Sequence, residues 1–310
     1  MPTDPLKMVL DRDLAMAEAR ETIEIAAPLL RELVNHGTNA YIRCQALTDR
    51  TGSVDEDLAA FTLYRQVLEL TDGIEVLVSN SCPVAAIPLV RSSFEAVLGL
   101  EFILRAESGQ RGLAWLCGYL VRKQKFYKSL DETTPQGAEY RKRFELEIGR
   151  APGIPSAWVK HGLAGVAASI AMDHLKDLFA EVKSAINENQ HWYSIRGGPK
   201  DLSGLADHLG HSIEYKTFYT RWSRFAYAGD LAAFLARDPA GEGAVATMRS
   251  SSSLQELAAG SVTIALRATK LMVHHYRDGE RLEVWYEREI MEPMARLETL
   301  RQDFLARRMT

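Results

Sequence analysis

Residues 84–104 read VAAIPLVRSSFEAVLGLEFIL, an apolar stretch interrupted by three charged residues, Arg91, Glu95 and Glu101. Arg91 and Glu95 are four residues apart, so in a helix they share one face and can form an ion pair. Burying a charge without a partner is costly, so an apolar helix that keeps two charges holds either a polar packing network or a ligand site. Arg91 and Glu95 are therefore the first candidate site residues.

Helical periodicity dominates the rest of the chain, and strand-like alternation is nearly absent. Capping boxes beginning at Ser53 and Ser253 predict two helix starts. The segments 150–157 and 238–243 carry the Gly and Pro residues typical of loops. The sequence therefore predicts an all-α fold, a multi-helix bundle of about nine or ten helices forming a single helical domain over residues 1–310.

Four segments give more detailed expectations. A first helix is expected over residues 6–35, bent at Pro28 because proline removes a backbone hydrogen bond. The polar segment 131–157 is expected to be a loop, and residues 213–237 a strong helix. The C-terminal helices, residues 253–308, are expected to pack on the remaining helices or to form a subunit interface.

Composition limits the classes of partner. The 310 residues carry a formal net charge of -4, so there is no global attraction to nucleic acid or to an anionic membrane. This leaves room for a local basic patch, and the helix that follows Gly109 turns basic at residues 122–125. The charges inside residues 84–104 argue against a membrane span, so we predict no membrane partner.

Cysteine usage and the N-terminus indicate the compartment. Cys44, Cys82 and Cys117 are widely spaced and form no Cys-x-x-Cys pair, which favours reduced thiols. The first residues contain no basic region followed by an apolar run, so no secretory signal is expected. Together these features predict a cytoplasmic protein.

A second candidate site lies between residues 215 and 227. Tyr215, Tyr219, Ser223 and Tyr227 are four apart, so one helical face carries a ladder of hydroxyl groups, with Arg221 beside it. Such a stripe belongs either to the core or to a site. Buried tyrosine hydroxyls need partners, and the charged pair of the apolar helix could supply them across a helix interface.

A third candidate is the segment that begins at Trp192. Arg196 is followed by Gly197 and Gly198, which let the backbone approach a ligand closely, and the guanidinium of Arg196 could contact an anion. The spacing is not that of a phosphate-binding P-loop, and no strand precedes it. A simple exposed turn is the alternative interpretation.

Two groups of histidines are candidate metal ligands. Glu188-x-x-His191 is half of a carboxylate-bridged dimetal pattern, and a helix would place His208 and His211 on one face. No second Glu-x-x-His motif accompanies them, so we predict no metal and no cofactor. Arg31-x4-His36 and Arg267-x6-His274 match the spacing used by ribonuclease-like helical domains, but chance produces such matches in a chain with eight histidines.

Several motifs together resemble a family of bacterial all-helical proteins of unknown function. They are Leu89-x-Arg91-x-x-x-Glu95, Trp192, Leu205-Ala206-x-x-Leu209-Gly210 and Tyr215-x-x-x-Tyr219-x-x-x-Ser223-x-x-x-Tyr227. The family's last motif generally reads Tyr-x-x-x-Ser-x-x-x-His, in a style similar to HEPN-type domains of RNA-targeting toxins and defence proteins. The resemblance covers about residues 55–235, and it implies a HEPN-like core and a role in stress response or phage defence.

The chain departs from this pattern at one residue, because Tyr227 stands where the family has histidine. The reference pKa of tyrosine is about 10, against about 6.5 for histidine, so tyrosine is a poorer general base near neutral pH. The resemblance therefore supports the fold more than an activity, and whether the protein is an enzyme stays open.

Two main functional hypotheses follow, and a metal-dependent helical oxidase or hydrolase is a third. In the first, the protein binds RNA or a nucleotide: Arg91 holds a phosphate, Glu95 orients Arg91, and the hydroxyl ladder positions the ligand. In the second, the protein is a non-enzymatic helical scaffold or interaction protein, and the polar centre only specifies packing. This protein would form a homodimer through its C-terminal helix, which carries Leu282, Trp285 and Ile290 on an apolar face.

Overall fold

A computed structural model of the chain describes residues 12–48, 54–226, 235–237, 243–245, 249 and 253–309. The described part is all-α except for one antiparallel pair of three-residue strands, β1 (Leu235–Arg237) and β2 (Gly243–Val245). It contains twelve helices when consecutive helical segments are counted as one, more than the nine or ten predicted.

The first eight helices are α1 (Arg12–Glu18), α2 (Arg20–Thr48), α3 (Val54–Ser79), α4 (Pro83–Arg105), α5 (Ser108–Leu130), α6 (Pro135–Ile148), α7 (Ser156–Ile170) and α8 (Asp173–Asn187). A 3₁₀ turn, η1 (Trp192–Gly197), and α9 (Leu202–Leu209) follow. The next helix consists of α10 (Ser212–Glu214), the π-helical turn η2 (Tyr215–Tyr219) and α11 (Thr220–Ala226). The last elements are α12 (Leu254–Tyr276), α13 (Leu282–Trp285), the π-helical turn η5 (Tyr286–Ile290) and α14 (Met291–Met309).

The chain divides into two compact units. Unit 1 comprises residues 1–53, 60–105 and 209–310, and unit 2 comprises residues 54–59 and 106–208. The loop at 150–157 lies inside unit 2, because α6 and α7 on either side of it both pack on α5. A single domain over residues 1–310 stays a prediction.

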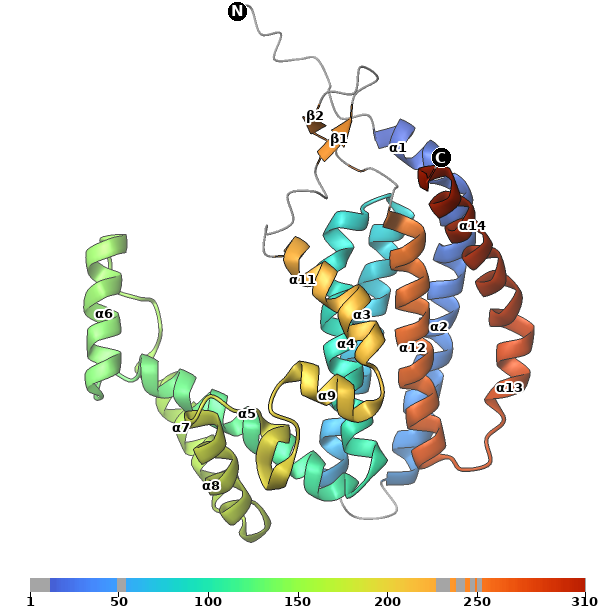
Figure 1. Cartoon of the computed structure of the whole chain (residues 1–310). Coiled ribbons are helices and arrows are strands. Elements are labelled where there is room, and N and C mark those ends of the chain that lie inside the picture. The colour runs from blue at the N-terminus through green and yellow to red at the C-terminus, as the bar shows by residue number, and fades with distance from the viewer. Residues whose placement is uncertain are drawn as a thin grey trace, which may run out of the picture. The chain divides into compact units, whose positions relative to one another are not determined.

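Unit 1 is a helical bundle whose long helices run side by side (Figure 1). Helix α12 packs against both α2 and α4, and α11 lies on α4. Leu30, Leu98 and Leu257 are among its fully buried side chains, exposed by 1% or less. Pro28 lies inside α2 without ending it. The first helix is therefore not the single bent helix expected over residues 6–35, because α2 begins at Arg20 and continues to Thr48.

The C-terminal helices belong to unit 1 and pack on its other helices. The indole nitrogen of Trp285 donates a hydrogen bond to Glu32 of α2 at 2.7 Å, and Ile290 and Leu297 are fully buried. Because α14 contacts α2 and α12, these apolar residues are already used within the chain. The homodimer through this helix stays a prediction, and on the same helix Val284 and Met291 remain 58% and 51% exposed.

Unit 2 is built around α5, which contacts α6, α7, α8 and η1. Helix α6 corrects the expectation of a loop over residues 131–157. The Thr134 side chain accepts a hydrogen bond from the amide of Gly137, Pro135 occupies the first turn, and Gly149 ends the helix with φ 75°. Helix α6 is largely polar and exposed, so it lacks the apolar periodicity from which the other helices were predicted.

A second correction concerns residues 213–237. The helix there is described as far as Ala226, and residues 235–237 form β1 rather than the end of a helix. No described helix is long and apolar enough to cross a membrane.

Candidate functional site

Arg91, Glu95 and Tyr219 meet where α11 lies on α4, and we call these three residues the Arg91 cluster. The Arg91 Nη2 atom donates a hydrogen bond to the Tyr219 hydroxyl at 2.9 Å and lies 3.3 Å from Glu95 Oε1. The Tyr219 hydroxyl in turn donates to the same Glu95 oxygen at 2.6 Å. Each polar group therefore contacts the other two in a closed triangle.

The environment of Tyr219 keeps its hydroxyl protonated. The residue is 7% exposed. Burial, and then the hydrogen bond to Glu95, raise its pKa to about 12, and the guanidinium of Arg91 opposes this rise. Since the hydroxyl is neutral near pH 7, it can donate to the carboxylate while it accepts from Arg91. The Arg91 side chain is 19% exposed and that of Glu95 is 43% exposed, so the cluster is shielded mainly on its arginine side.

The π-helical turn η2 shapes the tyrosine side of the cluster. The amide of Thr220 bonds to the carbonyl of Tyr215, five residues back, and the Thr220 hydroxyl donates to the same carbonyl at 3.0 Å. The rings of Tyr215 and Tyr219 are stacked, with centroids 5.0 Å apart. Such turns occur frequently at functional sites. Here the turn holds Tyr215 against the ring of Tyr219.

The other residues of the predicted hydroxyl ladder have different roles. The Ser223 hydroxyl donates to the carbonyl of Tyr219 at 2.8 Å, so its hydrogen is used within its own helix. Arg221 is exposed and pairs with Glu256 at 3.0 Å. Tyr227, which replaces the histidine expected from the resemblance, lies outside the described residues.

Trp192 and Arg196 belong to unit 2, whereas the Arg91 cluster belongs to unit 1. Trp192 is buried at 9% exposure, and its Cβ lies close enough to Gly118 of α5 that a methyl group there would approach it to 3.0 Å. Arg196 has φ 52° and pairs with Glu181 of α8 at 3.0 Å. Both residues therefore have packing or pairing roles within unit 2.

A second polar group in unit 1, which the sequence analysis missed, surrounds His211. Its Nε2 atom donates to Oε2 of Glu101 at 2.9 Å, and its Nδ1 atom lies 3.8 Å from Glu214. Arg105 pairs with Glu101 and Arg267 pairs with Glu214, each at 2.5 Å. We call these five residues the His211 cluster. Glu101 is 4% exposed, so it is a buried carboxylate whose charge is balanced by Arg105.

In the sequence, the signal for the His211 cluster is Glu101, a charged residue within the apolar helix α4. Glu101 was noticed as one of the charges of the apolar stretch, but nothing local in the sequence indicates that His211 pairs with it across 110 positions. Among the described residues, no group of three His, Cys, Asp or Glu side chains could hold a metal ion.

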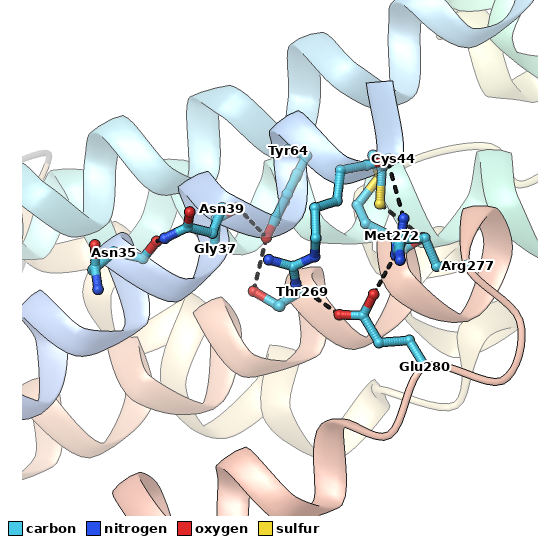
Figure 2. A network of polar contacts seen from close by, with 10 residues as sticks. Asn35, Gly37, Asn39, Cys44, Tyr64, Thr269, Met272, Arg277 and Glu280 are labelled. Atoms are coloured by element: carbon cyan, nitrogen blue, oxygen red, sulfur yellow. Dashed lines mark hydrogen bonds and ion pairs between the residues drawn. The ribbon is translucent and has the colours of Figure 1, made fainter. Parts of the chain in front are cut away.

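A third polar network joins α2, α3 and α12 of unit 1 (Figure 2). The Tyr64 hydroxyl contacts Thr269 at 3.0 Å and donates to the Gly37 carbonyl at 3.1 Å. Beside it, Glu280 pairs with Arg43 at 2.6 Å and also with Arg277. Although burial opposes it, hydrogen bonds from these two arginines lower the pKa of Glu280. The polar groups of this third network bond to one another across the helices, as expected for a network that stabilises packing.

In the two pairs Arg31-x4-His36 and Arg267-x6-His274, the arginine and the histidine contact different residues. Arg31 pairs with Glu75, whereas the ring of His36 stacks on Trp285 with centroids 3.8 Å apart. Arg267 pairs with Glu214, and His274, two turns further along α12, is exposed. Neither pair forms a common site.

The three thiols are free, as expected for reduced cysteines. Burial raises the pKa of Cys44 and of Cys117 to about 11, whereas Cys82 is partly exposed. Since the thiolate is the reactive form, the native protein should react with Ellman's reagent at pH 8 quickly at Cys82 and slowly at the other two. Unfolding in guanidinium should release all three thiols. Fast reaction of two or more thiols in the native protein would contradict the burial of Cys44 and Cys117.

Unit 2 exposes large aromatic side chains on α5 and α7. Tyr119 and Phe126 of α5 and Trp158 of α7 are 41%, 53% and 46% exposed. The ring centroid of Trp158 lies 6.3 Å from Phe126 and 5.0 Å from Tyr127. Lys123 places its Nζ atom 5.3 Å from the centroid of the Tyr119 ring. Exposed aromatic groups thus alternate with a basic side chain.

The charge of these two helices has one sign. Helix α5 contains no Asp or Glu, and α7 contains none either. Their basic residues are Arg111, Arg122, Lys123, Lys125, Lys128 and Lys160. The next acidic residue, Asp131, follows the end of α5 and accepts hydrogen bonds from Thr133. We call Tyr119, Arg122, Lys123, Phe126 and Trp158 the α5–α7 surface.

Comparison with protein-family models places residues 57–239, more than half of the chain, in a family of unknown function, DUF5677. The chain belongs to the DUF5677 family. The DUF5677 match includes all residues of the Arg91 cluster and of the α5–α7 surface, whereas α2, α12 and α14 lie outside it. Comparisons with curated proteins and with solved structures find no match.

Proposed function

We propose that this member of the DUF5677 family is a helical binding protein, in which the Arg91 cluster fixes α11 on α4 and the α5–α7 surface receives the ligand. The observation that carries the proposal is the contrast between the two. The polar groups of the Arg91 cluster bond to one another. The α5–α7 surface instead leaves three large aromatic side chains half exposed beside basic ones.

The closed geometry of the Arg91 cluster favours a structural role. A phosphate bound by Arg91 would compete with the Tyr219 hydroxyl and would lie beside the Glu95 carboxylate, 3.3 Å from Arg91 Nη2. Placing two anions this close is unfavourable, because like charges repel. This supports the non-enzymatic hypothesis over a HEPN-like site in stress response or phage defence at which Arg91 holds RNA or a nucleotide.

The α5–α7 surface has the composition of a binding site. Aromatic side chains and arginine are enriched at interfaces, where large rings supply contact area at low entropic cost. Contiguous exposed apolar groups surrounded by polar ones are uncommon on surfaces without a partner. Trp158, Phe126 and Tyr127 form such a group, and Arg122 and Lys123 lie beside it in the sequence of α5.

A paired stability measurement tests both halves of the proposal. Tyr219→Phe should lower the free energy of unfolding by about 1–2 kcal/mol, because it removes a hydrogen-bonding partner from both Arg91 and Glu95, the latter half exposed. Tyr140→Phe, on the exposed face of α6, is the control and should change it by less than about 0.5 kcal/mol. Urea unfolding followed by circular dichroism gives both values.

The second half of the proposal is tested by the double variant Phe126→Ala, Trp158→Ala. It should lower the free energy of unfolding by less than about 1 kcal/mol, since both side chains are half exposed. A loss of about 3 kcal/mol or more would mean that these rings belong to the core of unit 2 and would overturn their assignment to a ligand surface. An unchanged stability of Tyr219→Phe would overturn the structural role of the Arg91 cluster.

A further inference from the structure

We propose that the α5–α7 surface binds single-stranded nucleic acid, RNA or DNA, with bases stacked on Tyr119, Phe126 and Trp158 and phosphates held by Arg122 and Lys123. The inference rests on the proposed function, because it names the ligand class of the same surface. It is drawn from the positions, exposure and charge of these five side chains.

The helical spacing aligns the groups along one strip. Residues 119, 122, 123 and 126 stand at i, i+3, i+4 and i+7, so they share one face of α5. The two aromatic ends of this strip are about 10 Å apart along the helix axis, at 1.5 Å per residue. Trp158 of α7 extends the strip beyond Phe126, since their rings meet edge to face at 6.3 Å.

The chemistry of the strip matches a single strand. Proteins that bind single strands combine a positive track for the phosphates with aromatic rings on which successive bases stack. Double helices offer no unstacked bases to such rings. Helices α5 and α7 supply six Lys or Arg residues and no carboxylate, although the whole chain is acidic at -4.

The aromatic character separates this ligand from a membrane. Within the described residues, the exposed large apolar side chains of α5 and α7 are Tyr119, Phe126 and Trp158, all of them aromatic. A helix that lies in a membrane interface also exposes aliphatic side chains, which supply most of the buried apolar area. Flat rings beside cations are better suited to stacking, and Lys123 already lies over one ring.

The test is fluorescence anisotropy of the full chain with 5′-fluorescein-labelled 20-nucleotide oligo(U) and oligo(dT), in 50 mM and 200 mM salt. The 20-base-pair RNA duplex and anionic vesicles of phosphatidylglycerol and phosphatidylcholine are the competing probes. We expect both single strands to bind and the duplex to bind at least tenfold more weakly. Raising the salt should weaken binding, because phosphate contacts release counterions.

Two variants and two matched controls locate the binding. Trp158→Ala should weaken binding by about fivefold to 150-fold, the effect of losing one stacked base. Arg122→Gln with Lys123→Gln should reduce the slope of log K against log salt by about 1.4, the value for two phosphate contacts. Tyr140→Ala, and Lys142→Gln with Arg143→Gln, likewise remove one aromatic ring or two positive charges on α6 and should leave binding within about twofold.

Each other outcome overturns the inference. No binding of either single strand by the folded protein would remove nucleic acid as the ligand, and binding of vesicles alone would assign the surface to a membrane. Equal losses in the α6 controls would show a diffuse charge effect instead of a site. If Trp158→Ala does not fold, Phe126→Ala and the Arg122 and Lys123 double variant still decide. Folded variants that bind as tightly as the unchanged protein reject this ligand, whereas variants that unfold reject the proposed function.

Discussion

Glu101→Ala is expected to lower the free energy of unfolding by about 2–3 kcal/mol. Removing one member of a buried ion pair leaves its partner in an environment that disfavours charge, at a typical cost of about 3–5 kcal/mol. The lower value applies because the Arg105 side chain is 48% exposed and can turn to water, whereas His211 is 16% exposed and loses its hydrogen-bond acceptor. Urea unfolding at pH 7 gives the change.

Two further variants make this measurement specific. Glu101→Gln keeps the volume and one acceptor oxygen, so it should cost about half as much as Glu101→Ala. Glu69→Ala removes an exposed carboxylate, 64% exposed, that pairs with Arg65 one turn away, and it should cost less than about 0.5 kcal/mol. A cost for Glu101→Ala no greater than that of Glu69→Ala would contradict the structural role of the His211 cluster.

Leu98→Ala is expected to have the largest effect, a loss of about 3–5 kcal/mol. Leu98 is fully buried in α4, the helix that packs against α11 and α12, so its truncation loses transfer free energy and leaves a cavity. Val84→Ala on the same helix is the control, because Val84 is 43% exposed and should cost less than about 1 kcal/mol. Thermal unfolding of the two variants side by side gives the comparison.

A small effect at Leu98 would show that α4 is less tightly enclosed than its burial indicates. In Leu98→Ala, the contact between Tyr219 and Arg91 should break before global unfolding only if α11 separates from α4 first. Hydrogen exchange of the α11 amides in Leu98→Ala would reveal such early separation as exchange faster than that of α12.

The sequence predicts the fold class and one contact, and the reasons are local. Arg91 and Glu95 are one turn apart in an apolar helix, and a buried tyrosine needs a partner, so a contact between this pair and the tyrosine ladder was one of the expected alternatives; that Tyr219 is the partner is shown by the structure. The long helices follow from periodicity. The choice of Tyr219 among the tyrosines depends on how segments 128 positions apart approach one another.

The remaining features depend on information that no short window carries. Helix α6 is polar on most of its surface, so Thr134 and Gly149, its cap residues, were its sequence signals. The pairing of Glu101 with His211 depends on the return of the chain after unit 2. The exposure of Phe126 and Trp158 depends on which faces of α5 and α7 the other helices of unit 2 cover.

The hydrogen bond between Glu101 and His211 has a topological consequence. The chain leaves unit 1 just after Glu101 and returns to it just before His211, so this bond joins the two ends of residues 106–208, the long insertion that forms unit 2 together with residues 54–59. Insertions whose ends lie close together cost the host little closure entropy and can be lengthened or exchanged. The helices that carry Tyr119, Phe126 and Trp158 thus form a module that can diversify while the helices of unit 1 keep their own packing.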